Sequence, residues 1–224
     1  MRKLRLIALA AIAAVSMSAM AQYNYGHDHQ YKPTSKTIYG GDNEDFGLLY
    51  VQYNPSKLRY SHDGATASTN YNAISLGYSY YFALGDVPFY ISPGIAAQWL
   101  FTSDKHGSAE YKTNIISAKI PINLMYSIQV SSNFRIEPYA GIYGRINIWG
   151  QGKETYGGQS DTWDLFKDSE DSKAMKRFQL GWNAGLNFRI TNAFTIGGGY
   201  YMDLMKVADH TRFQGFDITL GVNL

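Results

Sequence analysis

Eight charged residues stand at alternate positions of segments in which apolar and polar residues alternate, and they are the side chains best placed for chemistry. An isolated buried charge costs several kcal/mol, so opposite charges enclosed in a narrow interior must pair. We interpret the set as a structural polar network that stiffens such an interior; a narrow conduit that slightly prefers anions is the alternative. The set comprises Lys119, Arg135, Glu137, Arg145, Arg177, Arg189, Asp203 and Asp217.

Three of the five histidines, His62, His106 and His210, fall between the alternating segments. A histidine beside a serine or an acid can activate a nucleophile for acyl transfer. This keeps open an enzyme that acylates or deacylates lipid A, although no recognised catalytic motif accompanies the histidines. The nearby serines and acids are Ser61, Asp63, Ser103, Asp104 and Asp209.

Other candidate sites are weaker, and we predict neither a cofactor nor a metal centre. The chain has no cysteine, which excludes cysteine-ligated zinc and iron–sulfur sites. The acidic segment 149–176 lacks the spacing of a calcium loop, and Gly197 to Gly199 lie within a strand pattern rather than before a helix. His27 and His29 could hold a metal weakly, but they lie in a segment that we interpret as a flexible extension.

The elements that must position these residues have a period of two. In the run 177–190, seven successive apolar residues alternate with polar ones, whereas a helix would repeat its apolar face every three or four residues. The pattern predicts eight strands. They cover about 46–54, 71–82, 88–101, 113–128, 134–148, 177–190, 194–205 and 213–224.

The connections between these strands alternate in length, at about 16, 5, 11, 5, 28, 3 and 7 residues. In an antiparallel meander, alternate connections lie at the same end, so the long loops share one end and the short turns the other. This asymmetry, with an even number of strands, is typical of bacterial outer-membrane barrels, whose periplasmic turns are short. We therefore expect the long loops to face outside the cell.

The polar phase of the strands indicates a narrow interior rather than a solvated surface. It is rich in glycine and small amides, such as Gly181, Asn183 and Asn187, where a solvated face would carry lysine and glutamate. Aromatic residues gather toward strand ends on the other phase, and we attribute the 19 tyrosines to the lipid interface. The predicted fold is all-β: a closed antiparallel eight-stranded up-and-down transmembrane β-barrel, because only closure satisfies strand backbones in lipid.

Three prolines, Pro93, Pro121 and Pro138, fall inside predicted strands, where each removes a hydrogen bond from the ladder. A closed barrel has no free edge on which to place them. We therefore expect bulges or local bends at these positions.

The first 21 residues read as a cleavable signal peptide. A basic start precedes an apolar run from Leu6 to Val15, and Ala19-Met20-Ala21 forms a small-residue cleavage site. We expect residues 22–45 to be a flexible periplasmic extension and 46–224 to be the barrel domain. Removing the leader leaves 17 basic residues against 18 acidic ones, so no basic excess points to nucleic acid.

The predicted strands carry the motifs KIPINL at 119–124, PYAG at 138–141, RFQLGWNAG at 177–185 and FDITLGV at 216–222. These motifs resemble the PorT-like outer-membrane β-barrel family, whose plan is similar to the eight-stranded OmpA-type barrel. The resemblance spans roughly 46–224 and rests on strand patterns rather than catalytic signatures. The last predicted strand of this chain is similar to the signal read by the barrel-assembly machinery, although Leu224 stands where an aromatic residue is usual.

These patterns together predict an integral protein of the bacterial outer membrane rather than an enzyme. We expect a structural, adhesive or interaction role through the extracellular loops, with a narrow channel for small solutes and a lipid A-modifying enzyme as alternatives. The expected partners are outer-membrane lipid and lipopolysaccharide, the assembly machinery during insertion, and an extracellular or periplasmic protein of unknown identity. Nucleic acid is not among them.

Overall fold

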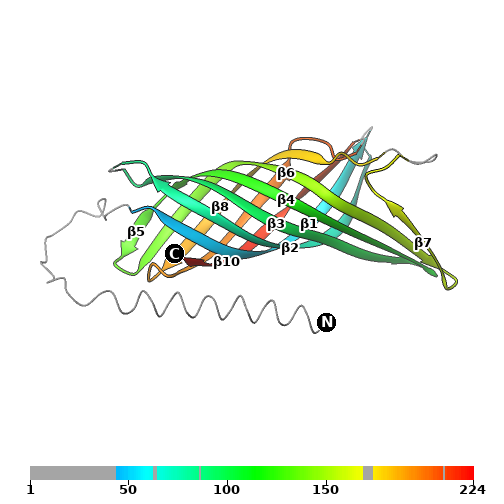
Figure 1. Ribbon diagram of the computed structural model, residues 1–224, viewed down its shortest axis with the longest axis horizontal. Helices are drawn as coiled ribbons and strands as arrows, with labels where there is room; N and C mark the ends of the chain where they lie inside the picture. Colours follow the sequence, from blue (N-terminus) through cyan, green and yellow to red (C-terminus); the bar gives the residue numbers. More distant parts are fainter. Residues whose placement is uncertain (1–43, 63–64, 86, 169–173, 209) are drawn as a thin grey trace, which may run out of the picture.

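The computed structural model describes residues 44–62, 65–85, 87–168, 174–208 and 210–224, and within them it is built from antiparallel strands (Figure 1). The strand pattern begins where the sequence predicts, at Phe46. The strands are β1 (Phe46–His62), β2 (Ala65–Ala83), β3 (Phe89–His106), β4 (Ala109–Tyr126), β5 (Ile128–Ser131), β6 (Phe134–Tyr156), β7 (Gln159–Asp164), β8 (Phe178–Ile190), β9 (Phe194–Asp203) and β10 (Thr211–Asn223).

The eight long strands pair in a cycle, and we call this set the ring. The order is β4-β3-β2-β1-β10-β9-β8-β6, and β6 pairs in turn with β4. Every pairing is antiparallel, including that of the first long strand with the last, where Leu48 lies opposite Asn223 and Tyr60 opposite Thr211. The ring thus follows the up-and-down order that the alternating connections predict.

The prediction of eight strands is wrong in its count, because the described residues form ten. β5 has 4 residues and β7 has 6, and each pairs with β6 alone, outside the ring. β7 occupies part of the segment predicted as the longest loop, and β6 extends through Tyr156 to meet it. Both are returning arms of hairpins. They lack the long alternating apolar pattern on which the sequence prediction depends.

Two of the other long loops are also replaced by strand. β1 and β2 remain paired to His62 and Ala65, and β3 and β4 remain paired to His106 and Ala109. Beyond the ring these strands are largely exposed, so the backbone ladder continues without an apolar face to reveal it. We call the end that carries these extended hairpins the hairpin end, and the opposite end the turn end.

The tight turns use the backbone geometry that their residues allow. At the hairpin end, Gly107 and Gly157 have φ of 61° and 57°, in the left-handed region that glycine enters without strain. At the turn end, Thr191 and Asn192 have φ of 53° and 55°, the geometry of a type I′ hairpin turn. The sequence correctly predicts this three-residue connection between β8 and β9.

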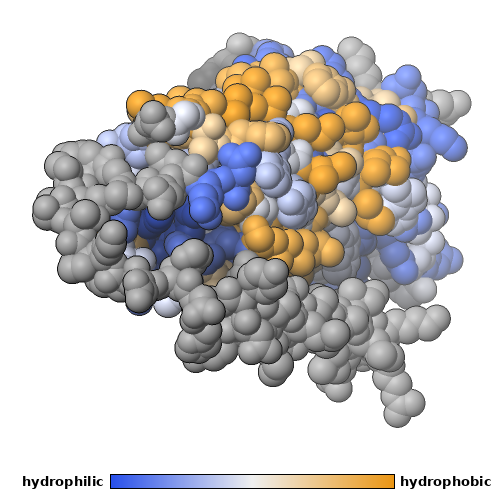
Figure 2. Space-filling view, turned by 60° about the vertical axis from the view of Figure 1, so that its left-hand side comes forward, coloured by the Kyte–Doolittle hydropathy of each residue, from blue (hydrophilic) through white to orange (hydrophobic). Residues whose placement is uncertain are grey.

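Alternation divides the strands into an apolar outer face and a mostly polar interior. Apolar side chains gather on the outer surface of the strands (Figure 2). Ile95 is 59% exposed and Phe216 62% exposed, values that a soluble protein would seldom allow for so many large apolar residues. The buried side includes Ser75, Gln98 and Asn147. An apolar solvent around the ring accounts for this inverted distribution.

Of the bulges or local bends expected at the prolines, the bulges do not occur in the described ladders. Pro138 pairs in continuous register with Leu186, and Pro121 with Tyr143. Next to Pro93 the β2–β3 ladder lacks two rungs, but the register is unchanged on either side of the gap. The β4–β6 ladder does shift register at Ile116/Ser117, away from any proline. The ladder is therefore interrupted next to Pro93 but continues through Pro121 and Pro138 in these pairings, and at none of the three is a residue inserted.

The predicted signal peptide and nearly all of the predicted extension, with His27 and His29, lie outside the described residues. No helix in the described part of the chain is long and apolar enough to span a membrane.

Candidate functional site

The interior of the ring holds six of the eight charged residues singled out in the sequence. β6, β8, β9 and β10 contribute most of them, and alternate residues of each strand point to the same side. Arg135 and Arg177 lie apart from the buried six. The buried residues are Lys119, Glu137, Arg145, Arg189, Asp203 and Asp217.

Arg145 and Asp203 form the central ion pair of the interior. The guanidinium Nη2 lies 2.6 Å from Asp203 Oδ2, and the two side chains are 1% and 0% exposed. The Tyr143 hydroxyl donates a hydrogen bond of 2.6 Å to the other carboxylate oxygen. Lys119 Nζ lies 4.3 Å from the centroid of the Tyr143 ring and 5.1 Å from that of Tyr201, within the range of cation–π attraction. The layer thus holds two cations around one carboxylate and two aromatic faces.

Glu137 and Arg189 form a second buried ion pair toward the turn end. Arg189 donates from Nε at 2.8 Å and also from Nη2 to the same carboxylate oxygen, which accepts a third bond of 3.1 Å from Ser127. The β6–β8 register explains the pairing, because Glu137 lies opposite Asn187, two residues from Arg189. The Arg189 guanidinium lies 3.8 Å from the ring centroid of Phe46.

The remaining charged residues take three different positions. Asp217 accepts a hydrogen bond of 3.3 Å from the Tyr139 hydroxyl inside the ring. Arg135 is half-buried and lines a cavity of about 170 Å³ at the turn end. Arg177 is exposed at the hairpin end, where it donates to the Ile148 carbonyl at 2.8 Å and lies 4.6 Å from the ring centroid of Phe166. Arg135 and Arg177 therefore sit at opposite rims of the interior.

The interior also contains tyrosines that the sequence analysis assigned to the lipid interface. For these residues the assignment is wrong, because their strand phase points inward. Cross-strand glycines carry the signal that could have located them: Gly77 lies opposite Tyr50, and Gly181 opposite Tyr143. A Cβ atom at either glycine would collide with the facing tyrosine ring. The buried tyrosines are Tyr50, Tyr71, Tyr81, Tyr90, Tyr143 and Tyr201.

An apolar cluster, which we call the plug, fills the hairpin end of the interior. Phe166 and Val207 come from segments between strands and are 9% and 0% exposed. They pack with Leu100, Ile115 and Phe213, which point inward from β3, β4 and β10. A backbone bond of 2.7 Å from Lys176 N to the Val207 carbonyl ties the two inter-strand segments together. The plug closes the interior above the central ion pair.

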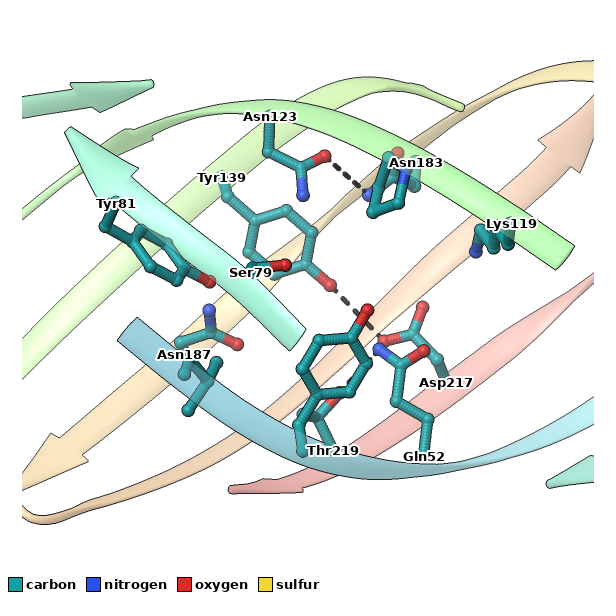
Figure 3. Close-up of a pocket in the computed structure, with 13 residues that line it drawn as sticks. Gln52, Ser79, Tyr81, Lys119, Asn123, Tyr139, Asn183, Asn187, Asp217 and Thr219 are labelled. Atoms are coloured by element: carbon teal, nitrogen blue, oxygen red, sulfur yellow. Dashed lines mark hydrogen bonds between the residues drawn. The ribbon is translucent and has the colours of Figure 1, made fainter. Parts of the chain in front are cut away.

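A small polar cavity lies in the interior (Figure 3). Tyr139, which lines it, stands on β6 between Glu137 and Arg145 of the two ion pairs. Its volume of about 40 Å³ has room for about three water molecules. Asn183 donates a hydrogen bond of 2.9 Å to Asn123 across this space, and Lys119 and Asp217 line it. The arrangement suits ordered water rather than the passage of a solute.

The histidines of the hairpin end are only partly brought together. The ring centroids of His62 and His210 lie 4.2 Å apart, and Ser61 N donates to the His210 carbonyl at 3.0 Å. His106 ends β3. Asp63 and Asp209 lie outside the described residues. Within the described part of the chain, no three His, Asp or Glu side chains group closely enough for a metal ion.

Comparisons with known proteins agree with this architecture. A family model described as outer membrane protein beta-barrel domain matches residues 57–209. A search of curated protein sequences gave no match.

Three solved structures are similar at low identity. Ail of Yersinia pestis has 14% identity and a TM-score of 0.45, and the match covers 80% of this chain and 99% of that one. Neisserial surface protein A has 17% identity and a TM-score of 0.40, with 79% and 96% covered. The N-terminal barrel of Pseudomonas aeruginosa OprF has 11% identity and a TM-score of 0.32, with 80% and 99% covered.

Proposed function

This chain belongs to the family of outer membrane protein β-barrel domains, and we propose that it acts as a closed, non-conducting barrel with a structural, adhesive or interaction role at its hairpin end. It is an integral protein of the bacterial outer membrane. Within the family, the strand motifs of the sequence favour the PorT-like group. The lipids of this membrane, with lipopolysaccharide, and the assembly machinery during insertion are the partners that this location implies.

The filled interior is the observation that carries the proposal. The plug, the central ion pair and the second ion pair follow one another along the interior, and the cavity between the ion pairs has room for only about three waters. A conduit would need these layers to separate, which would leave buried charges unpaired. This favours a scaffold over the channel.

The hairpin end is the natural surface for interaction. Outer-membrane barrels keep short turns in the periplasm and longer segments outside, which would place the hairpin end outside the cell. There β3, β4, β6 and β7 continue as a four-stranded sheet beyond the ring: Lys105 pairs with Glu110, Tyr111 with Glu154, and Glu154 with Asp161. Among the described residues β7 pairs with β6 alone, which leaves its other edge available to a partner strand.

Conductance of the purified protein in planar bilayers tests the closed interior. We expect no discrete openings under conditions in which a general porin shows them. Regular current steps from the wild-type protein would contradict the scaffold and favour the channel.

Trimming a hairpin tests the interaction surface. A variant with Asn-Gly in place of residues 153–162 joins Gly152 to its cross-strand partner Trp163 by a short turn. It should keep the heat-modifiable migration of a folded barrel but lose the proteins that crosslink to the wild type on intact cells. The matched control replaces residues 61–66 at the tip of the β1–β2 hairpin. Equal partner recovery from the wild type and both variants would contradict a role for the hairpin end.

A further inference from the structure

Cations gather on the outer face of the strands at the hairpin end, on the same face as the apolar surface below them. All six are exposed, and they come from five strands of the ring. Glu110 is half-buried among them and bonds Lys112 at 3.0 Å. They are Lys57, Arg59, Lys105, Lys112, Lys153 and Arg212.

The strand register sets two like-charged pairs directly opposite each other. Arg59 faces Arg212 across β1 and β10, and Lys112 faces Lys153 across β4 and β6. Like charges in directly opposed positions destabilise a sheet. Glu110 relieves the lysine pair, but in the described part of the chain no carboxylate bonds Arg59 or Arg212. The arginine pair therefore costs stability unless an anion bridges it.

These cations lie at the depth of lipid headgroups. On β10, Arg212 stands four residues beyond Phe216, the last large exposed apolar residue toward the hairpin end. On β1, Lys57 stands four residues beyond Tyr53. Four strand residues rise about 13 Å, or about 10 Å along the membrane normal at the tilt of such barrels. Long cationic side chains at that height reach the phosphates at the edge of the hydrocarbon.

In the described ranges of the chain, the turn end has no matching belt of exposed cations. Among the described residues there, Arg135 is accompanied by Glu44 and Asp45 around the same cavity. The excess of positive charge on the outer face is therefore specific to the hairpin end.

We propose that Arg59 and Arg212, with Lys57 beside them, bind a phosphate group of the anionic lipid in the outer leaflet, the phosphate of lipid A. Two guanidinium groups supply planar pairs of donors that match phosphate oxygens. The position next to the apolar surface selects a phosphate that is anchored in the membrane over one that is free in solution. The inference rests on the proposed function, because it places the hairpin end in the outer leaflet.

The test compares lipid retention with thermal stability in a zwitterionic detergent, with and without lipid A. Arg59→Gln and Arg212→Gln should each lower the lipid A that co-purifies by about fivefold, the effect of one cation at a charged membrane surface. Without lipid A, both variants should lose heat-modifiable migration at the same temperature as the wild type or a higher one, because the repulsion is gone. Lipid A should reverse that order.

Arg135→Gln removes the same charge at the turn end and should leave lipid A retention unchanged. Unchanged retention in both Arg59→Gln and Arg212→Gln would overturn the lipid site, while the bilayer and trimming experiments would still stand for the scaffold. Inorganic phosphate is the second probe, and stabilisation equal to that given by lipid A would overturn the assignment to a lipid. Heat-modifiable migration of each variant shows that it is folded before its lipid is measured.

Discussion

The interior of the ring and the sheet that projects from its hairpin end each contain an ion pair, but the first pair is buried and the second is exposed to solvent. Arg145 and Asp203 meet inside at 2.6 Å with side chains 1% and 0% exposed. Lys112 and Glu110 meet on the projecting sheet at 3.0 Å, 48% and 29% exposed. Water solvates the second pair whether or not it forms, but it cannot reach the first. The comparison teaches that position relative to the membrane, rather than contact distance, sets what each pair contributes to stability.

The largest expected effect comes from breaking the central ion pair. Asp203→Ala leaves the Arg145 guanidinium buried without its carboxylate, which costs about 3–5 kcal/mol of unfolding free energy. Urea unfolding in detergent micelles, followed by heat-modifiable migration, measures it. The control is the triple variant Arg145→Met, Asp203→Leu and Tyr143→Phe, which also removes the hydroxyl that donates to Asp203, and it should lie near the wild type. If Asp203→Ala lowered the free energy of unfolding by no more than the loss of an exposed ion pair does, the two regions would not differ in this respect.

Emptying the plug should have the next largest effect. Phe166→Ala removes a ring that is 9% exposed and should cost about 3 kcal/mol, the low end of the range for a core phenylalanine. The same unfolding experiment measures it, with Phe166→Leu as the control that keeps most of the apolar side chain. In planar bilayers we expect the variant to stay closed, because the central ion pair remains below the plug. Steady current steps would instead make the plug the sole barrier.

Adding a methyl group to the packed interior should lower the stability of the protein by a smaller amount. A Cβ atom at Gly181 collides with the Tyr143 ring, so Gly181→Ala should destabilise the protein by about 1–3 kcal/mol. Gly144→Ala is a matched control on β6, because its Cβ would meet only the edge of Phe178 at 3.7 Å, an ordinary contact. Equal thermal midpoints for the two variants would show that the interior is loosely packed.

The smallest effect belongs to the projecting sheet. The hydrogen bond from Lys112 lowers the pKa of the Glu110 carboxyl below its ordinary value of 4.5. A lowered folded-state pKa stabilises the protein above the unfolded pKa, and this contribution is lost as the pH falls through the folded value. Thermal midpoints taken below pH 4.5 should therefore fall slightly more for the wild type than for Glu110→Gln. A steep acid loss that depends on Glu110 would show that this pair is not freely solvated.

Particular residues show where prediction from the sequence succeeds and where it fails. The alternation in 177–190 predicts β8 and the inward position of Asn183, and Phe46 marks the start of β1 in both sequence and structure. The prediction of long loops is wrong because the hairpins beyond the ring are paired through their backbones. Exposed side chains of any polarity fit such a ladder, so the sequence pattern does not reveal it. Arg177 lies at the rim, where its guanidinium meets the ring of Phe166 from the same connection between β7 and β8.

The sequence by itself determined the eight long strands of the ring, their two faces and the asymmetry of the two ends, because a period of two and the lengths of connections are local properties. Only the tertiary structure decided which charges meet. Asp203 on β9 reaches Arg145 on β6 past the intervening β8, and this depends on the relative shift of three strands. The plug and the opposed arginines likewise depend on register and closure. A pattern that repeats every two residues fits several registers equally well, and packing in three dimensions selects among them.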